Sequence, residues 1–178
     1  DTDMSNLLRN VVPSYNVNDQ PISDAATLVR PANLRGLAPD HTLMLVNGKR
    51  RHRASVITWL GNGISNGSQG PDAAAIPGAA LKRIEVLRDG ASAQYGSDAI
   101  AGVMNFVLND ASEGGSLEVR YGEYKEGDGE QVTIAGNIGL PLGDSGFLNL
   151  TAEWGESDPT SRSEQRADAQ GLIDDGYQ

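Results

Sequence analysis

Residues 81–108, LKRIEVLRDGASAQYGSDAIAGVMNFVL, carry the pattern that decides the fold. The apolar, β-branched run at 83–87 predicts a buried strand, and residues 103–108 predict a second strand. Between the two strands, residues 91–95 and 98–101 each fit a single helical turn that ends at a glycine. Strands separated by such short helical turns are typical of a small mixed α/β sheet.

The sequence before this stretch adds one strand, one turn and one helix. Residues 41–47, HTLMLVN, predict a strand, and the following Asn47-Gly48 predicts a tight turn. Residues 33–37 are expected to be extended. Near the start of the chain, Asp3 can cap a short helix through residue 10, whose buried face would carry Leu7, Leu8 and Val11.

The segment between the two sheet-forming stretches predicts a long loop. Residues 50–76 show no helical or strand period and contain glycines at positions 61, 63, 67 and 70. Order is expected again at Pro77, which suits the first turn of a short helix through Leu81. Loops of this length inside a compact domain are usually functional or mobile.

From residue 111 the hydrophobic period becomes two. Apolar residues alternate with polar ones around 117–121, 132–140 and 148–154, which predicts three strands of about ten residues each. A compact turn at 141–146 and a charged turn at 125–129 connect them. This alternation is typical of an outer-membrane β-barrel, although a soluble antiparallel meander shows the same pattern. Three strands cannot close a barrel, since even the smallest needs eight, so we expect the chain to be a fragment.

Composition and charge exclude several classes of protein. The 178 residues include no cysteine, which excludes a disulfide scaffold, thiol catalysis and cysteine-ligated metal sites. The net charge of −10 divides into −2 over 1–40, +3 over 41–100 and −11 over 101–178. Such local basicity argues against a nucleic-acid-binding protein. No apolar run of about 18 residues is present, so a membrane-spanning helix is not expected.

The residues also give no support for catalysis or for a metal site. His41 and His52 lack a partner at metal-ligand spacing, and the glycine-rich stretch 61–70 lacks the Lys-Ser/Thr pair of a phosphate-binding loop. The acidic residues at 126, 128 and 130 fit a charged hairpin turn better than a calcium loop. We therefore expect no catalytic residue, no cofactor and no metal, and we do not expect an enzyme.

Four motifs occur in a specific order along the first 110 residues. They are Leu34-Arg35-Gly36-Leu37, then Val46-Asn47-Gly48-Lys49-Arg50, then Ile76-Pro77 leading into Leu81-Lys82-Arg83-Ile84-Glu85-Val86-Leu87-Arg88, and then Tyr95-Gly96-Ser97-Asp98-Ala99-Ile100-Ala101-Gly102-Val103-Met104-Asn105-Phe106. This ordered set resembles the plug domain of TonB-dependent outer-membrane receptors over roughly residues 3–110. The strands that follow resemble the start of that family's barrel.

The resemblance implies a fold and a function. The fold would be an α+β plug domain over 1–110, with a small mixed sheet and short helices, followed over 111–178 by antiparallel strands of an incomplete transmembrane β-barrel. The function would be ligand-gated, energy-coupled import of an iron-siderophore, cobalamin or an oligosaccharide across the bacterial outer membrane.

The implied partners are the TonB-ExbB-ExbD complex, a small-molecule ligand such as a ferric chelate, and outer-membrane lipid. No TonB box is seen before Asp3. The alternative is a soluble periplasmic α/β interaction module with a β-meander.

The resemblance also assigns roles to individual residues. Arg35 and Arg88 match the plug arginines that pair with barrel-wall glutamates, which would lie beyond Gln178; the alternative is that both are ordinary surface arginines. The long loop corresponds to an apical, ligand-facing loop of the family. Its candidate ligand contacts combine cationic donors, an aromatic face and an amide, which suit an anionic chelate or a sugar: Arg51, His52, Arg53, Trp59 and Gln69. The alternative is a solvated loop without a ligand.

Overall fold

The computed structural model describes residues 4–17, 29, 32–58, 63–160, 169, 171 and 174–176. The chain forms two compact units, one of residues 1–118 with 135–153 and the other of residues 119–134 with 154–178. Among the described residues, none of the helices has both the length and the apolar character needed to cross a membrane.

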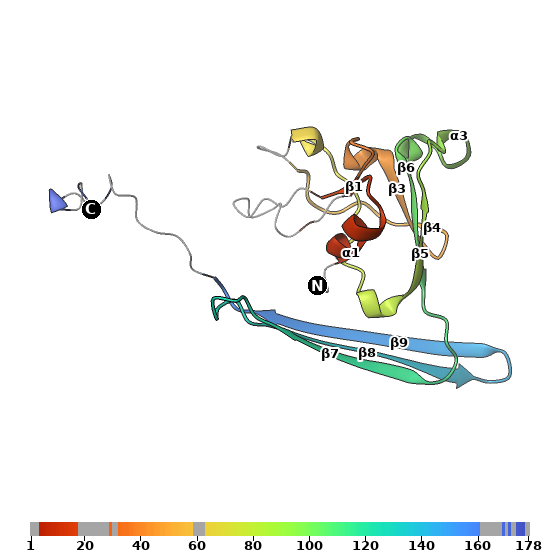
Figure 1. Ribbon diagram of the computed structural model, residues 1–178. Helices are drawn as coiled ribbons and strands as arrows, with labels where there is room; N and C mark the ends of the chain where they lie inside the picture. Colours follow the sequence, from red (N-terminus) through yellow and green to blue (C-terminus); the bar gives the residue numbers. More distant parts are fainter. Residues whose placement is uncertain are drawn as a thin grey trace. The chain divides into compact units, whose positions relative to one another are not determined.

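A four-stranded mixed sheet is the centre of the first unit. Its strands are β3 (Thr42–Val46), β4 (Lys49–Arg50), β5 (Leu81–Leu87) and β6 (Gly102–Leu108). The order across the sheet is β4-β3-β6-β5, in which β3 and β6 are parallel and the two outer pairs are antiparallel (Figure 1). The expected small mixed sheet with short helices is therefore confirmed.

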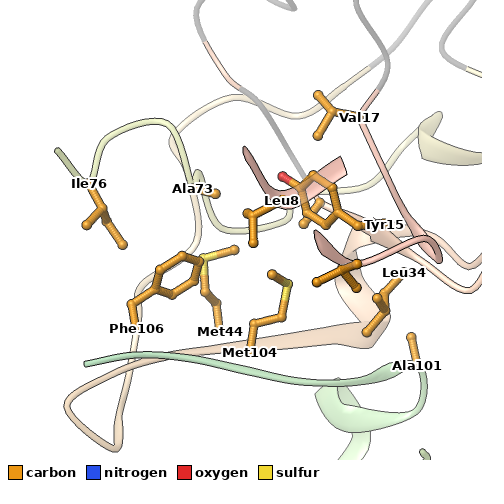
Figure 2. Close-up of a cluster of buried hydrophobic side chains, with 12 residues drawn as sticks. Leu8, Tyr15, Val17, Leu34, Met44, Ala73, Ile76, Ala101, Met104 and Phe106 are labelled. Carbon is orange, nitrogen blue, oxygen red and sulfur yellow. The ribbon is translucent and has the colours of Figure 1, made fainter. Parts of the chain in front are cut away.

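The two central strands are buried on both faces, because their alternate side chains enter two separate clusters. On one face, Met44, Met104 and Phe106 pack against Leu8, as Figure 2 shows. On the other face, the smaller cluster consists of Leu43, Leu45, Ala99 and Val103. Burial on both faces explains why β3 and β6 are almost continuously apolar in sequence.

The N-terminal segment covers the first of these faces. Helix α1 (Met4–Val11) leads into β1 (Tyr15–Asn16), which pairs antiparallel with β2 (Asn33–Leu34). The expected burial of Val11 is wrong, because this side chain is 58% exposed. The burial of Leu8 is confirmed, and Val12, four residues further on, is buried in place of Val11, since residues four apart lie on the same side of a helix. Asp3 and the side chain of Leu7 lie outside the described residues.

The described residues include the short helical segments η1 (Pro39–His41), η2 (Gly63–Ser65), η3 (Gly78–Ala80), α3 (Ser92–Tyr95) and η4 (Ser97–Ala99). Three of these, η3, α3 and η4, lie close to expected positions, whereas η1 and η2 were not expected. His41 thus belongs to a 3₁₀ turn rather than to the strand that follows it. The extended segment expected at 33–37 ends after Leu34, where the chain turns at Arg35 and Gly36 with positive φ at both residues.

Strand β5 differs from its expected burial. Residues 83–87 were expected to form a buried strand, but Ile84 and Val86 are only half-buried and Leu87 is 45% exposed. The physical reason is position, because β5 lies at the edge of the sheet and has one neighbouring strand. The Asn47-Gly48 turn is confirmed, with φ of 49° and 75°, as a two-residue hairpin loop requires.

The remaining strands form an antiparallel three-stranded sheet in the order β7-β8-β9. Their bounds are Gly115–Gly122, Gln131–Leu142 and Gly146–Ser157. Pro141 was expected in a turn but belongs to the end of β8. One set of alternate side chains is apolar and exposed, and it consists of Leu117, Val119, Tyr121, Ile134, Ile138, Leu140, Leu142, Leu148, Leu150 and Trp154. The period of two predicted from the sequence is present in all three strands.

Candidate functional site

The structure gathers four of the five predicted ligand contacts around one cavity. Its volume is about 190 Å³, and it lies beside the start of β3 and the segment that follows β4. Arg51, His52, Arg53 and Gln69 all line it. The fifth candidate, Trp59, lies outside the described residues. The complete lining is Pro39, Asp40, Thr42, Leu43, Met44, Arg50, Arg51, His52, Arg53, Gln69, Pro71 and Asp98.

Hydrogen bonds from backbone and side-chain groups hold the two walls of this cavity together. The Arg51 N–H donates to the carbonyl oxygen of Met44 at 2.8 Å, which continues the hairpin beyond β4. Opposite, the Gln69 N–H donates to Asp40 Oδ1 at 2.9 Å, and the Gln69 side-chain amide donates to the Ala54 carbonyl at 2.8 Å. Gln69 therefore ties both walls together.

Asp98 organises two of the arginines. Arg50 Nη1 lies 2.7 Å from Asp98 Oδ2, and Arg53 Nη2 lies 3.7 Å from Asp98 Oδ1. Arg50 also donates to the carbonyl of Tyr95. In contrast, Arg51 makes no side-chain ion pair with any described residue. The cavity thus holds more positive charge than its carboxylates neutralise, and Arg51 is the arginine of its lining that has no ion-pair partner among the described residues.

A second hollow of about 300 Å³ borders the same segment. Arg51 and His52 line it as well, together with Val29, Ala54, Ser55, Val56, Asp72 and Ala75. The Arg51-His52 dipeptide therefore borders both hollows. Guanidinium and imidazole groups can both donate hydrogen bonds to the oxygen atoms of an anion.

A buried hydroxyl cluster shapes the loop that follows. Thr58 Oγ1 donates to the carbonyls of Ser65 and Ser68, and Ser68 Oγ donates to the Ser65 carbonyl at 2.6 Å. Ser65 Oγ also donates to Asn33 Oδ1 at 3.0 Å, which connects the loop with β2. The expectation of a loop without regular period holds, but its base is fixed by side-chain hydrogen bonds. Sequence analysis missed these residues because serine and threonine in a glycine-rich stretch also occur in solvated loops.

Arg35 and Arg88 follow two strand ends that meet at Gly102. A Cβ atom at Gly102 would lie 2.3 Å from the Leu87 carbonyl oxygen and 2.8 Å from Leu34 Cδ2. Leu34 of β2 directly precedes Arg35, and Leu87 of β5 directly precedes Arg88, so the two arginines follow strands of different sheets that both approach Gly102. Both are exposed, and neither forms an ion pair with a described residue. The acidic partners implied by the resemblance are not among the described residues.

A polar network lies on the edge of the sheet. Arg83 Nε donates to Glu85 Oε1 within the same strand at 2.7 Å. The Asn105 amide of β6 donates to Glu85 Oε2 at 2.9 Å. The Asn105 hydrogen bond and, second, the Arg83 hydrogen bond lower the pKa of Glu85 below its ordinary value. No group of three acidic, histidine or cysteine side chains able to hold a metal occurs within the described ranges.

Comparison with known proteins agrees with the ordered motifs. The family model described as TonB-dependent Receptor Plug Domain matches residues 1–103. The ferrienterobactin receptor of Escherichia coli K12 is 32% identical over 156 residues, which are 83% of this chain and 20% of that protein. The ferric enterobactin receptor of Pseudomonas aeruginosa is 30% identical over 142 residues, or 78% of this chain and 18% of that protein. The chain thus spans about a fifth of the length of these curated relatives.

The fold has a solved counterpart as well. The crystal structure of a mutant of the ferric enterobactin receptor PfeA from Pseudomonas aeruginosa, in complex with enterobactin, superposes with a TM-score of 0.65. It is 25% identical in sequence, and the similarity covers 88% of this chain and 22% of that one. The residues of the cavity and both arginines lie within residues 1–103, which the family model matches.

Proposed function

Because the chain belongs to the TonB-dependent receptor plug family, we propose that it gates an outer-membrane receptor that imports a ferric siderophore. Residues 1–110 would be the plug, and residues 111–178 would begin the barrel that surrounds it. The energy would come from the TonB-ExbB-ExbD complex, which would displace or unfold part of the plug. The cavity that gathers Arg51, His52, Arg53 and Gln69 is the observation that carries the proposal.

The chemistry of the cavity favours an anionic chelate over a neutral ligand. Arg51 has no carboxylate partner among the described residues, and Arg50 and Arg53 share the single carboxylate of Asp98. A ligand with several negatively charged oxygens would supply the missing acceptors through charge-assisted hydrogen bonds. The cavity is too small to enclose a complete siderophore, so the plug would contribute one wall of a larger site. Relatives named as ferric enterobactin receptors support the same ligand class.

The exposed apolar face of β7, β8 and β9 supports a place in the membrane. Ten large apolar side chains on this face are exposed in the described structure. A soluble meander would need to cover such a face, whereas in a barrel wall it contacts lipid. We therefore favour the barrel interpretation over the soluble periplasmic module.

Binding of a ferric siderophore to the complete receptor tests the proposal. We expect Arg51→Gln to weaken binding about tenfold, since a hydrogen bond to a charged group contributes roughly 1.5–3 kcal/mol. Lys49→Gln is the matched control, because Lys49 is an exposed cation of the same hairpin that lies outside the cavity lining. Equal affinities for the Arg51 and Lys49 variants would argue against a ligand at this cavity, and the absence of any siderophore binding would overturn the ligand class.

A further inference from the structure

The segment between the last strand of the plug sheet and the first strand of the antiparallel sheet makes hydrogen bonds in two directions. This linker comprises residues 109–114. Toward the plug sheet, the Asn109 N–H donates to the Ala80 carbonyl at 2.8 Å, and Lys82 Nζ lies 2.7 Å from Asp110 Oδ1. Toward β8 and β9, most of the contacts come from side-chain amides. These contacts are more buried and more numerous than those toward the plug sheet.

The contacts toward β8 and β9 form a chain of amides, which we call the amide ladder: Asn109, Asn137, Asn149 and Thr151. The Asn109 amide donates to Asn137 Oδ1 at 3.1 Å. Asn137 Nδ2 donates to Asn149 Oδ1 at 2.6 Å and to Thr151 Oγ1 at 2.7 Å. Asn149 Nδ2 in turn donates to the Ala111 carbonyl of the linker at 3.2 Å. The ladder thus begins and ends on the linker.

Asn137 is the centre of this ladder. Its side chain is only 8% exposed, and all of its hydrogen-bonding capacity is used. Both amide hydrogens are donated, and Oδ1 accepts from Asn109 and, at 3.4 Å, from Asn149. The other three side chains of the ladder are half-buried, and removing the buried central member would leave several of these partners without a hydrogen bond.

The backbone of the linker also fits closely onto β8. The Gly139 N–H donates to the Gly114 carbonyl at 2.8 Å, and the Ala111 N–H donates to Asn109 Oδ1 at 3.2 Å. A Cβ atom at Gly139 would lie 2.3 Å from the Ala111 carbonyl oxygen. Only glycine at position 139 allows the linker backbone to approach β8 this closely.

The contacts toward the plug sheet are weaker. Lys82 and Asp110 are 46% and 55% exposed, and an ion pair in water contributes little to stability because solvent and salt screen it. A load on the plug sheet would therefore break these contacts before it breaks the amide ladder.

We propose that the amide ladder keeps residues 109–114 attached to β8 and β9 while the plug sheet moves, so that separation occurs between the linker and β5. This inference rests on the proposed function only where it invokes plug movement during transport. The attachment itself is a property of the folded protein and can be measured without a ligand.

Hydrogen exchange of the complete receptor tests the attachment. In Asn137→Leu, the amides of Ala111 and Gly139 should exchange at least about tenfold faster, because one lost buried hydrogen bond changes an opening equilibrium by roughly that factor. Gln131→Leu, an exposed amide-to-leucine change on the same strand, should leave both rates unchanged. Thr151→Val removes one acceptor from the edge of the ladder and should give a smaller increase. Unchanged exchange in both ladder variants would overturn the proposal.

Cross-linking tests the direction of separation, since the chain contains no native cysteine. One receptor would carry Asn109→Cys with Asn137→Cys, and the other Lys82→Cys with Asp110→Cys, each joined by the same short bifunctional thiol reagent. We expect the 82–110 cross-link to stop ferric siderophore uptake and the 109–137 cross-link to permit it. The reverse result, or a block by both cross-links, would overturn the proposal. If the unmodified receptor does not transport the siderophore, the proposed function fails, and the exchange experiment still decides the attachment.

Discussion

Gly102 is the residue at which the plug sheet has least room for a side chain. Its φ is +145°, and a Cβ atom would lie within 2.3 Å of a backbone carbonyl oxygen, which cannot move aside without shifting β5. We expect Gly102→Ala to lower the free energy of unfolding by about 1–3 kcal/mol, measured by urea denaturation. Gly122→Ala, where no atom lies within 4 Å and φ is ordinary, should change it by less than about 0.5 kcal/mol. Similar losses in both variants would contradict the close approach at Gly102.

Glu85 gives a prediction of pH dependence. Hydrogen bonds from Asn105 and, second, Arg83 lower its pKa from the ordinary value of 4.5. Because the pKa is lower in the folded than in the unfolded chain, the stabilisation is complete above about pH 4.5 and is lost as pH falls through the folded-state pKa. We expect NMR titration of the Glu85 carboxyl carbon to give a midpoint below 4.5, and Asn105→Ala to raise this midpoint more than Arg83→Gln does. A midpoint at or above 4.5 in the unmodified chain would refute the assignment.

At the scale of single elements, the two faces of β9 should differ in their tolerance of charge. Leu150 lies on the exposed apolar face near the middle of the strand, whereas Glu153 lies on the opposite face. For the complete receptor folded into lipid vesicles, Leu150→Arg should cost about 2–4 kcal/mol if this position lies near the bilayer midplane. Glu153→Arg should cost much less. Equal costs would indicate that the apolar face is covered by protein rather than by lipid.

The elements also show how far sequence reasoning extends. The Asn47-Gly48 turn, both central strands and the period-two strands could be predicted, because turn chemistry and alternation are local properties. The burial of β5 could not be predicted, since whether a strand lies at an edge depends on pairing between distant segments. The predicted burial of Val11 was wrong because, in a short helix, tertiary packing decides which side chains face the core.

The candidate site shows the same division between local and distant information. Arg51, His52 and Arg53 are adjacent in sequence, so their common location was predictable. Asp98, the counter-ion of Arg50 and Arg53, lies at least 45 residues away in the chain and reaches them because β3 and β6 are parallel neighbours. The amide ladder was missed for a related reason, since asparagine in a strand has several roles and its partners come from three separate segments.

For the whole molecule, the distribution of charge agrees with the proposed role of residues 41–100 in binding an anionic ligand. The excess of basic residues lies in 41–100, which contains the cavity, and the acidic excess lies in 101–178. An electropositive plug surface would attract an anionic chelate, because clefts of one charge sign raise the local concentration of oppositely charged ligands. Ligand attraction and plug retention would then depend on different arginines.

The latch proposed for Arg35 and Arg88 can be separated from ligand binding in the complete receptor. Each arginine directly follows a residue that approaches Gly102, and neither belongs to the cavity lining. If they pair with buried barrel-wall glutamates, their joint replacement by alanine leaves uncompensated charges, which typically costs 3–5 kcal/mol for a buried pair. We expect this double variant to bind ferric siderophore with unchanged affinity but to retain its plug poorly, seen as greater sensitivity of cells to a bulky antibiotic. Lys49→Ala, which removes an exposed cation of the same domain, should leave sensitivity unchanged. Normal plug retention in the double variant would mean that both residues are ordinary surface arginines.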